Sequence, residues 1–397
     1  MRENLLFLSH RIPYPPNKGD KIRSFHLLDH LSRKYSVHLG TFVDDEADWQ
    51  YQDVLKKICG KCCLIPMNPR ISKLQSLSGF VSGEALTLPY YRNRELQRWV
   101  DSTISELDIT RIVVFSSAMA QYVEKHEDAR RIMDFVDIDS DKWTQYAESK
   151  SWPLDAIYRR EGKLLEKYER KIAGEFDASF FVSSQEAALF KRIVPEYAAN
   201  THFYCNGVDA GYFSPDRDYA DPFPAGEKAI VFTGAMDYWP NIDAVKWFSE
   251  EIFPIVLGKI PDARFHIVGS NPAPAVSRLA ALPGVMVTGR VADVRPYLAH
   301  AKVAVAPLRI ARGIQNKVLE AMAMEKPVVA SPQALEGIAE NEGCLLGDSA
   351  EEFAAHVIHV LEGKMSFETG RSCILKNYDW EKNLAEFSSH LERGKQP

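Results

Sequence analysis

The chain is most easily interpreted outward from residues 306–331, which read Ala306-Pro-Leu-Arg-Ile-Ala-Arg-Gly-Ile-Gln-Asn-Lys-Val-Leu-Glu-Ala-Met-Ala-Met-Glu-Lys-Pro-Val-Val-Ala-Ser331. The pattern predicts a buried strand, a loop, a short helix that begins near Asn316, and a second strand at residues 328–330. A glycine before a helix, here Gly313, lets the backbone approach a ligand, and the N–H groups and dipole of the helix favour an anion. The stretch therefore predicts an anion site at the start of this helix.

Charged side chains of the same stretch indicate which kind of anion would bind there. Arg309, Arg312 and Lys317 surround the predicted helix start, and Glu320 lies one turn into the helix. The Glu320 carboxylate can accept hydrogen bonds from vicinal hydroxyls such as those of a ribose. We interpret this as a site for a nucleoside diphosphate. The alternative is an ordinary core around Val318, with the three cations solvated.

Length and composition exclude several classes of protein. The 397 residues suffice for two domains, and 46% hydrophobic with 26% charged residues is typical of globular chains. A net charge of −6 argues against nucleic-acid binding. Residues 1–10 resemble a first strand rather than a signal peptide, and no apolar run approaches the roughly 18 residues of a transmembrane helix. We expect a cytoplasmic protein, soluble or peripheral at the inner face of the cytoplasmic membrane.

Short β-type runs alternate with longer helical runs along the chain, which predicts parallel sheets covered by helices. The clearest helix spans about residues 155–173. A linker rich in proline follows residue 207 and separates two such series. The fold class is therefore α/β, with two doubly wound Rossmann-like domains, 1–207 and 208–378, that face a cleft. The expected strands are residues 5–8, 37–42, 64–65, 112–115, 132–136, 178–182, 229–233, 264–268, 285–288, 303–306, 328–330 and 345–346.

Residues 68–83 carry apolar side chains at helical spacing, together with Arg70, Lys73 and several serines. One interpretation is an amphipathic helix that contacts a membrane or a lipid-linked substrate. We favour a helix packed on its own sheet, because only two cations accompany the apolar face.

The six cysteines fit reduced thiols better than a disulfide framework. Cys59 and Cys62 form a CxxC motif, but no second pair or nearby histidine cluster completes a zinc site. We therefore expect no bound metal.

No GxGxxG, Walker A or HExxH motif occurs. Instead, residues 313–331 resemble the C-terminal signature of family 4 retaining glycosyltransferases of the GT-B architecture, and Lys317 with Glu320 is the most specific part. Residues 206–209 resemble the turn that closes the first domain of that family, and residues 231–244 resemble the opening strand and loop of the second. More narrowly, residues 11–23 resemble the sugar transferases of bacterial exopolysaccharide (PEP-CTERM-associated) clusters. The resemblance covers nearly the whole chain.

The resemblance implies a metal-independent enzyme without cofactor, which moves a sugar from a UDP- or GDP-linked donor on the second domain to a glycan or lipid-linked acceptor on the first. Glu320 would bind the ribose, and Lys317 with the helix start would bind the diphosphate. A helix over residues 379–397 would cross back to the first domain. The expected donor-binding residues are Gly19, Gly234, Arg290, Val291, Arg309, Gly313, Ile314, Asn316, Lys317, Val318 and Glu320.

Two departures from the family pattern concern charge. The position eight residues before Glu320, often Glu in the family, is Arg312, and residues 234–242 lack the usual basic residue. We hypothesise that Arg312, Arg309 or Arg290 supplies the missing diphosphate cation. Arg312 is therefore counted with Lys317 among the candidate catalytic residues.

The first domain offers a basic loop after its first strand and a carboxylate cluster after residues 132–136. Within that cluster we expect Asp137 to be catalytic, orienting the acceptor or the donor sugar. The loop has a plainer interpretation, as a solvated loop before a helix with Asp20 in its first turn. The expected acceptor-side residues are Arg11, Lys18, Asp20 and Arg23.

Two other functions stay open. Sugar-nucleotide 2-epimerases share this architecture, although the order of motifs suits a transferase better. A non-catalytic partner subunit that binds sugar nucleotides is the third interpretation, motivated by Arg312.

Overall fold

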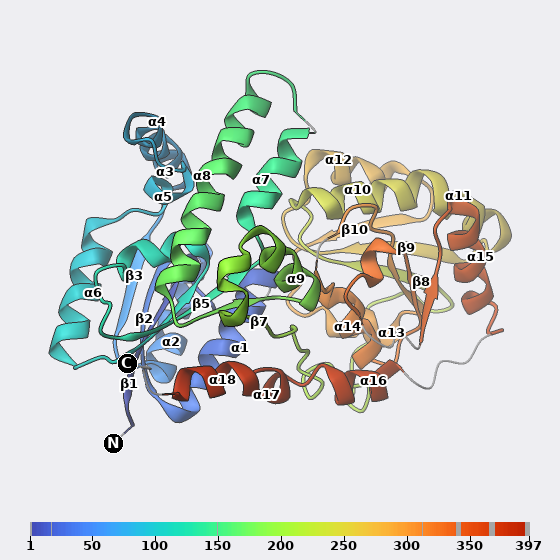
Figure 1. Ribbon diagram of the computed structural model, residues 1–397. Helices are drawn as coiled ribbons and strands as arrows, with labels where there is room; N and C mark the ends of the chain where they lie inside the picture. Colours follow the sequence, from blue (N-terminus) through green and yellow to red (C-terminus); the bar gives the residue numbers. More distant parts are fainter. Residues whose placement is uncertain are drawn as a thin grey trace. The chain divides into compact units, whose positions relative to one another are not determined.

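The computed structural model describes residues 2–16, 18–148, 150–311, 313–338, 343–364 and 370–393. The chain forms two compact units, each built around one parallel sheet (Figure 1). Unit 1 comprises Met1–Cys205 with Leu384–Pro397, and unit 2 comprises Asn206–Asn383. The predicted α/β class with two doubly wound domains is confirmed.

Unit 1 contains a seven-stranded sheet in the order β3-β2-β1-β4-β5-β6-β7. The order reverses between β1 and β4, and ligands of open α/β sheets bind at such a reversal, beyond the carboxyl ends of the strands. The central strands β1 and β4 are nearly continuous apolar runs because helices cover both faces of the sheet. The strands are β1 (Asn4–Ser9), β2 (Ser36–Val43), β3 (Cys62–Pro66), β4 (Arg111–Phe115), β5 (Arg130–Val136), β6 (Ala178–Phe181) and β7 (Thr201–Phe203).

Local signals explain where the helices of unit 1 begin. Asn93 accepts hydrogen bonds from the first turn of α6, and Ser183 does the same for α9. The helix predicted at 155–173 is α8, with Leu165, Tyr168 and Ile172 buried along one face. The helices are α1 (Gly19–Lys34), α2 (Gln52–Ile58), α3 (Pro69–Ser76), α4 (Ser78–Ser82), α5 (Thr87–Tyr90), α6 (Arg94–Glu106), α7 (Asp139–Glu148), α8 (Leu154–Glu175), α9 (Ser184–Ile193) and α18 (Ala385–Glu392), with 3-10 turns Glu46–Tyr51, Ser117–Tyr122 and Pro195–Asn200.

Unit 2 contains a six-stranded parallel sheet in the order β10-β9-β8-β11-β12-β13. Its strands are β8 (Lys228–Thr233), β9 (Ala263–Val268), β10 (Val285–Gly289), β11 (Val303–Ala306), β12 (Val328–Ala330) and β13 (Cys344–Leu346). Its helices are α10 (Trp239–Trp247), the π-turn Phe248–Ile252, α11 (Phe253–Lys259), α12 (Pro274–Ser277), α13 (Arg295–His300), α14 (Asn316–Ala323), α15 (Ala350–Leu361), α16 (Gly370–Asn377) and α17 (Trp380–Asn383), with 3-10 turns Arg278–Ala281 and Gln333–Leu335.

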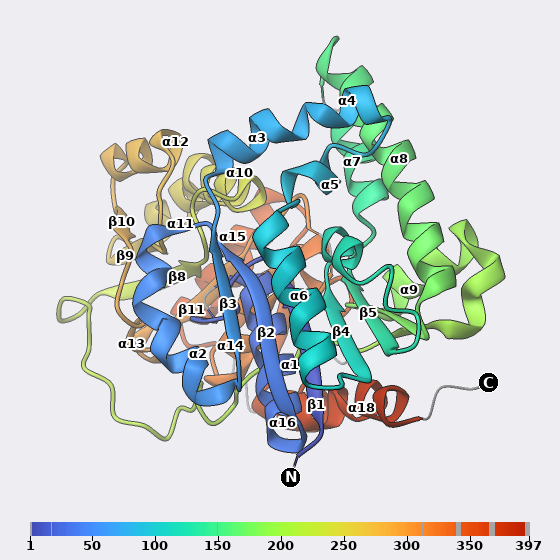
Figure 2. The same cartoon turned by 90° about the vertical axis from the view of Figure 1, so that its left-hand side faces the viewer.

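The chain returns to unit 1 at its end, as predicted. Figure 2 shows α18, in red, below β4 and β5. Leu384, Phe387 and Leu391 are buried at helical spacing, and the Phe387 ring centroid lies 4.8 Å from that of Phe180 on β6. Residues 394–397 of the predicted crossover helix lie outside the described residues.

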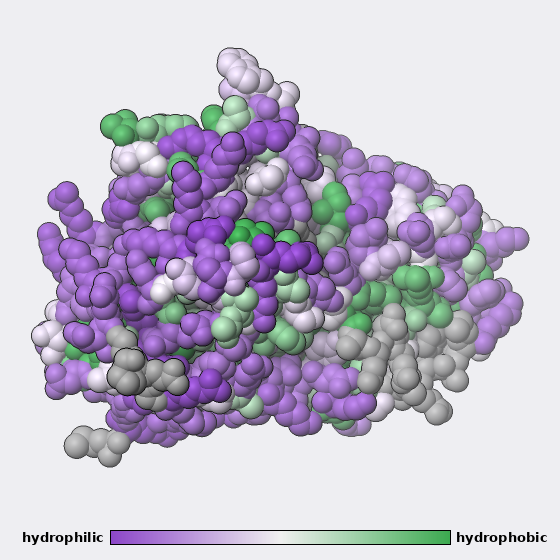
Figure 3. Space-filling view, viewed as in Figure 1, coloured by the Kyte–Doolittle hydropathy of each residue, from purple (hydrophilic) through white to green (hydrophobic). Residues whose placement is uncertain are grey.

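The helical segment at residues 68–83 forms α3 and α4, but the prediction that its apolar side packs on the sheet is wrong. Val81 is 93% exposed and Leu74 70%, and Ile71, Leu77 and Phe80 are also exposed. Figure 3 shows these helices as hydrophobic surface at the upper left. In the part of the chain that the structure describes, no helix is long and apolar enough to cross a membrane.

Candidate functional site

The stretch at residues 306–331 forms β11, a loop, α14 and β12 in the predicted order. Gly313 has φ +64°, a left-handed conformation that glycine adopts without strain. Gln315 precedes α14, and its side chain donates to the Gly313 carbonyl at 3.1 Å instead of capping the helix. The first turn of α14 can therefore present N–H groups to a ligand.

Lys317 lies in this first turn beside β8. Its Nζ donates to Asn241 Oδ1 at 2.6 Å and lies 4.1 Å from the centroid of the Phe232 ring. Burial lowers the pKa of Lys317 to about 7, although the charge of Glu320 opposes that shift. A partly buried ammonium of this kind is stabilised by an anionic ligand, because the ligand replaces the missing solvation.

Gly234 directly follows β8 and lies beside this cluster. A Cβ atom at Gly234 would lie 2.8 Å from Asn241 Nδ2 and 3.3 Å from Lys317 Nζ. Asn241 Nδ2 also donates to the Ala235 carbonyl at 2.9 Å, so that one side chain ties the loop after β8 to Lys317. Any larger residue at position 234 would therefore displace the Asn241 side chain. Asn241 was not among the predicted site residues. The sequence feature that could have indicated it is a polar residue in the first turn of the helix after β8.

Glu320 lies three residues after Lys317 on α14. Burial raises the pKa of its carboxyl group to about 7, while Lys317 lowers it. Asn316, at the start of the helix, accepts a hydrogen bond from Asn206 Nδ2 at 3.3 Å. The structure thus brings together Gly234, Lys317 and Glu320 as predicted, with Asn241 added.

The predicted arginines are placed differently. Arg309 forms a bidentate ion pair with Asp243 on α10, with distances of 2.9 and 2.5 Å. Arg290 is exposed after β10, and Arg312 lies outside the described residues. That one of these arginines completes the diphosphate site stays a prediction.

The remaining predicted donor residues differ in their exposure. Ile314 and Val318 are buried, Val318 in the core with a side chain 1% exposed, and Val291 is partly buried. A ligand could therefore reach Val318 only through its backbone.

Unit 1 contains a cavity of about 590 Å³ at the carboxyl ends of β1, β4 and β5, next to the reversal of strand order. Ser116 after β4 and Val136 at the end of β5 both line it, with φ +75° and +71°. Left-handed backbone at a β-branched residue is costly and clusters at functional sites. Other lining residues include His10, Asp20, Lys73, Tyr91, Asp137, Lys142, Trp143 and Glu161.

Two of the predicted acidic residues face this cavity. Asp137 accepts from Lys142 Nζ at 2.6 Å, and Asp20 accepts from Arg11 Nη1 at 2.6 Å. Burial alone would raise the pKa of Asp20, but the hydrogen bond from His10 and the charge of Arg11 prevail and hold this pKa well below its usual range. The Asp20 carboxylate is therefore available as an acceptor for hydroxyl groups.

The N-terminal basic residues are separated by the start of α1. Gly19 is the first residue of this helix, and Lys18 immediately precedes it. Arg23 is turned inward with no exposed surface, and its guanidinium pairs with Asp134, with Nε–Oδ2 and Nη2–Oδ1 distances of 3.0 Å. The acceptor-side role predicted for Arg23 is therefore wrong, because the helical phase directs it into the core.

Sequence reasoning missed Glu161 of α8. This buried carboxylate accepts from Leu86 N at 2.6 Å and from the backbone N and hydroxyl of Thr87 at 2.9 and 2.7 Å. It fixes the segment before α5 against one wall of the cavity. A glutamate within a charged helix gives no local signal of such a role.

Comparisons with known proteins agree with this geometry. Residues 227–363 match the family model described as "Glycosyl transferases group 1". No curated protein matches the chain by sequence.

Several solved structures share the fold. A glycosyltransferase from Rickettsia africae has 14% identity and a TM-score of 0.64, covering 99% of this chain and 100% of its own. Anabaena HepE, solved with UDP and glucose, has 15% identity and a TM-score of 0.65, and the match covers 98% of this chain and 99% of HepE. WaaG, a glycosyltransferase involved in lipopolysaccharide biosynthesis, has 15% identity and a TM-score of 0.63, and the match covers 98% of this chain and 100% of WaaG. The chain thus has the two Rossmann-like domains of the GT-B fold, and its residues 227–363, which hold Asn241, Lys317 and Glu320, match the Glycosyl transferases group 1 model.

Proposed function

We propose that the protein is a retaining glycosyltransferase that moves a sugar from a UDP-linked donor to a hydroxyl of a glycan or lipid-linked acceptor in exopolysaccharide synthesis. The observation that carries this is the cluster of Gly234, Asn241 and Lys317, with Glu320 one turn along α14, inside the residues that match a glycosyltransferase model. Anabaena HepE is solved with UDP and glucose, which supports UDP over GDP as the donor nucleotide.

The chemistry follows from the charge that develops on the leaving group. When the bond between the anomeric carbon and the diphosphate oxygen breaks, negative charge grows on the phosphate. Lys317 and the N–H groups of α14 stabilise that charge. The acceptor oxygen bonds to the anomeric carbon, and its proton passes to the leaving diphosphate. Retention without a protein nucleophile requires this transfer on one face of the sugar, and side chains rather than a metal neutralise the phosphate.

The cavity of unit 1 supplies the acceptor side of this proposal. Asp20 and Asp137 offer carboxylate oxygens, and Tyr91 and Trp143 offer aromatic faces. This combination suits a sugar, because its hydroxyls need hydrogen-bond acceptors and its C–H faces pack on aromatic rings.

We propose further that α3 and α4 rest on an anionic lipid surface, which would bring a lipid-linked acceptor to this cavity. Residues 68–83 carry two cations and no acid, and their apolar side chains are exposed. Lys73 of α3 lines the cavity. Arg160 of α8 anchors α4 by donating to the Gly79 carbonyl at 2.8 Å, and the exposed cations Arg159, Lys163 and Lys167 line a groove beside Gly83. Apolar residues flanked by cations are typical of interfacial membrane contacts.

Sedimentation with vesicles tests this surface. The wild type is expected to bind phosphatidylglycerol-containing vesicles more strongly than pure phosphatidylcholine vesicles. The variant Leu74→Ser, Leu77→Ser, Val81→Ser should bind at least about tenfold more weakly, since three exposed apolar side chains are removed. The matched control replaces Met286, Leu346 and Leu375, each 51% exposed in unit 2, by Ser and should bind like the wild type. Equal vesicle binding by both variants, or loss of self-association instead of vesicle binding, would contradict the proposal.

A nucleotide panel tests the donor half of the function. Melting temperature should rise with UDP more than with GDP, ADP or CMP, because a ligand of the folded state raises its stability. Turnover is then followed with UDP-sugars and hydroxyl acceptors. An isomerised sugar nucleotide formed from donor alone would identify an epimerase instead, and donor binding without turnover on any acceptor would identify a binding subunit.

A further inference from the structure

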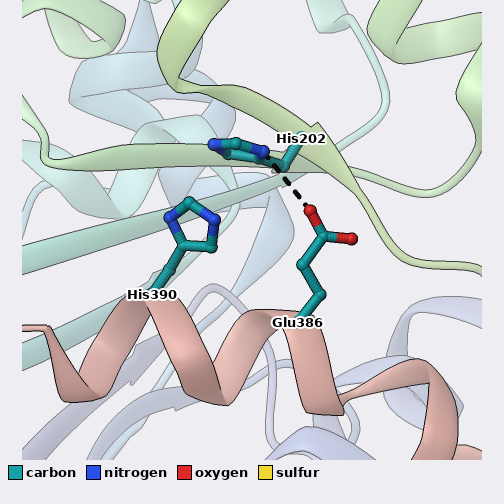
Figure 4. Close-up of side chains that lie close together, drawn as sticks. All are labelled: His202, Glu386 and His390. Carbon is teal, nitrogen blue, oxygen red and sulfur yellow. Dashed lines mark ion pairs between the residues drawn. The ribbon is translucent and has the colours of Figure 1, made fainter.

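We propose that His202, Glu386 and His390 bind a Zn²⁺ ion that joins the last helix of unit 1 to the edge strand of its sheet. Glu386 and His390 are four residues apart on α18, so their side chains project from the same face of the helix. His202 lies in β7, the last strand of the sheet. Figure 4 shows the three side chains converging between the helix and the strand.

The ligand atoms are close to metal-binding geometry. One ligand atom from each residue lies within 4.8 Å of the other two. His202 Nδ1 and Glu386 Oε1 are 3.4 Å apart, and ligands at zinc bond lengths in a tetrahedron are also separated by about 3.4 Å. Rotation of the His390 side chain would complete three protein ligands. The Glu386 side chain is 53% exposed, which leaves room for water as the fourth ligand.

His390 lies directly against His202 and is 7% exposed. Its ring centroid lies 4.0 Å from that of His202, so two imidazoles are in contact without a carboxylate between them. Two imidazoles that share a site cannot both be protonated at low cost, whereas a metal ion satisfies both nitrogens.

The types of ligand atom favour zinc. Two nitrogens and one carboxylate oxygen suit Zn²⁺, whereas Mg²⁺ and Ca²⁺ prefer oxygen ligands alone.

The surroundings set the expected affinity and role. Arg393, Arg130 and Lys191 lie near enough to oppose a dication. We therefore expect a dissociation constant on the order of micromolar, weaker than that of four-ligand structural sites. The ion would add to existing contacts of α18, such as His30 Nε2 with Ser388 Oγ at 2.7 Å. The role is structural and independent of the proposed sugar transfer.

Calorimetric titration and thermal melting of the chelator-treated full chain with ZnCl₂, and with MgCl₂ in parallel, test the site. One Zn²⁺ per chain should bind and raise the melting temperature by a few degrees, and Mg²⁺ should do neither. Glu386→Gln and His202→Gln should each weaken binding at least about tenfold. Glu386 is exposed, so Glu386→Gln should fold normally, as circular dichroism would show.

Two control variants locate the metal. His359→Gln alters an exposed histidine of unit 2 and should leave binding unchanged, and Cys62→Ser removes a thiol that could compete for zinc. Binding that is lost in Cys62→Ser but kept in Glu386→Gln, or no stoichiometric binding at all, would overturn the proposal. UDP binding should be the same in all four variants, so failure of the zinc site and failure of the proposed function give different results.

Discussion

Replacing Lys317 with Met is expected to lower kcat/KM for the UDP-linked donor by about 10²–10³-fold, the effect of removing one preorganised group from developing oxyanion charge. Lys317 Nζ is held by Asn241 Oδ1 at 2.6 Å, so its charge is positioned before the donor binds. Lys326→Met, on a lysine beyond the other end of α14, is the matched control and should keep near wild-type rates. Steady-state kinetics measure both variants, and a Lys317→Met enzyme of wild-type activity would exclude the proposed diphosphate contact.

A pH profile separates this charge role from a packing role. With pKa values of about 7 for both Lys317 and Glu320 in the free protein, the combination of ammonium and carboxylate is most populated near pH 7. Donor affinity should fall below pH 7 because Glu320 gains a proton, and above pH 7 because Lys317 loses one. Each decrease should be at most about tenfold per pH unit. Glu320→Gln should abolish the acid limb and Lys317→Met the alkaline limb. The intact UDP-sugar is the ligand to titrate, because the terminal phosphate of UDP itself gains a proton in this range.

Arg23→Met should destabilise the protein by about 3–5 kcal/mol, because it leaves the fully buried Asp134 without its cation. The guanidinium also donates to the Tyr204 carbonyl at 2.8 Å and lies 3.5 Å from the centroid of the Tyr204 ring. Arg33→Met on the same helix breaks only the exposed i,i+4 pair with Asp29 and should cost about 0.5 kcal/mol or less. Urea unfolding measures both variants.

A double variant shows that the loss comes from an unpaired charge. Arg23→Met combined with Asp134→Leu should recover part of the stability lost in Arg23→Met, since no buried charge is left without a partner. The loss of unfolding free energy in the double variant is compared with the sum of the losses in the two single variants. If the double variant loses more than that sum, the hydrogen bonds to Tyr204 and Phe181 carry the effect instead.

Local pattern was sufficient for the framework of the proposed donor site. Apolar runs, Gly313 and the start of a helix at Asn316 predicted β11, α14 and β12, because strand and helix periodicity depend on neighbours in the chain. Lys317 and Glu320 could be placed close together for the same reason, since two residues three positions apart on one helix keep their spacing wherever the helix lies. Their roles toward a donor stay a prediction. Asn241 belongs to a different element, and only the packing of α10 against α14 brings it to Lys317.

The sequence by itself thus determined the α/β class and the closeness of Lys317 and Glu320 on one helix, both of which depend on periodicity within single segments. The return of the final helix was expected only from the resemblance to a family. Tertiary structure alone decided whether a charged or apolar side chain is inside or outside. Arg23 looked like a loop cation and is in the core, whereas Leu74 and Val81 looked like core and face the solvent. Tertiary structure alone also brings His202, near the end of the first domain, to Glu386 and His390 on the last helix. Burial and partnership depend on which distant segment packs against a side chain, and the composition of its own segment does not specify that partner.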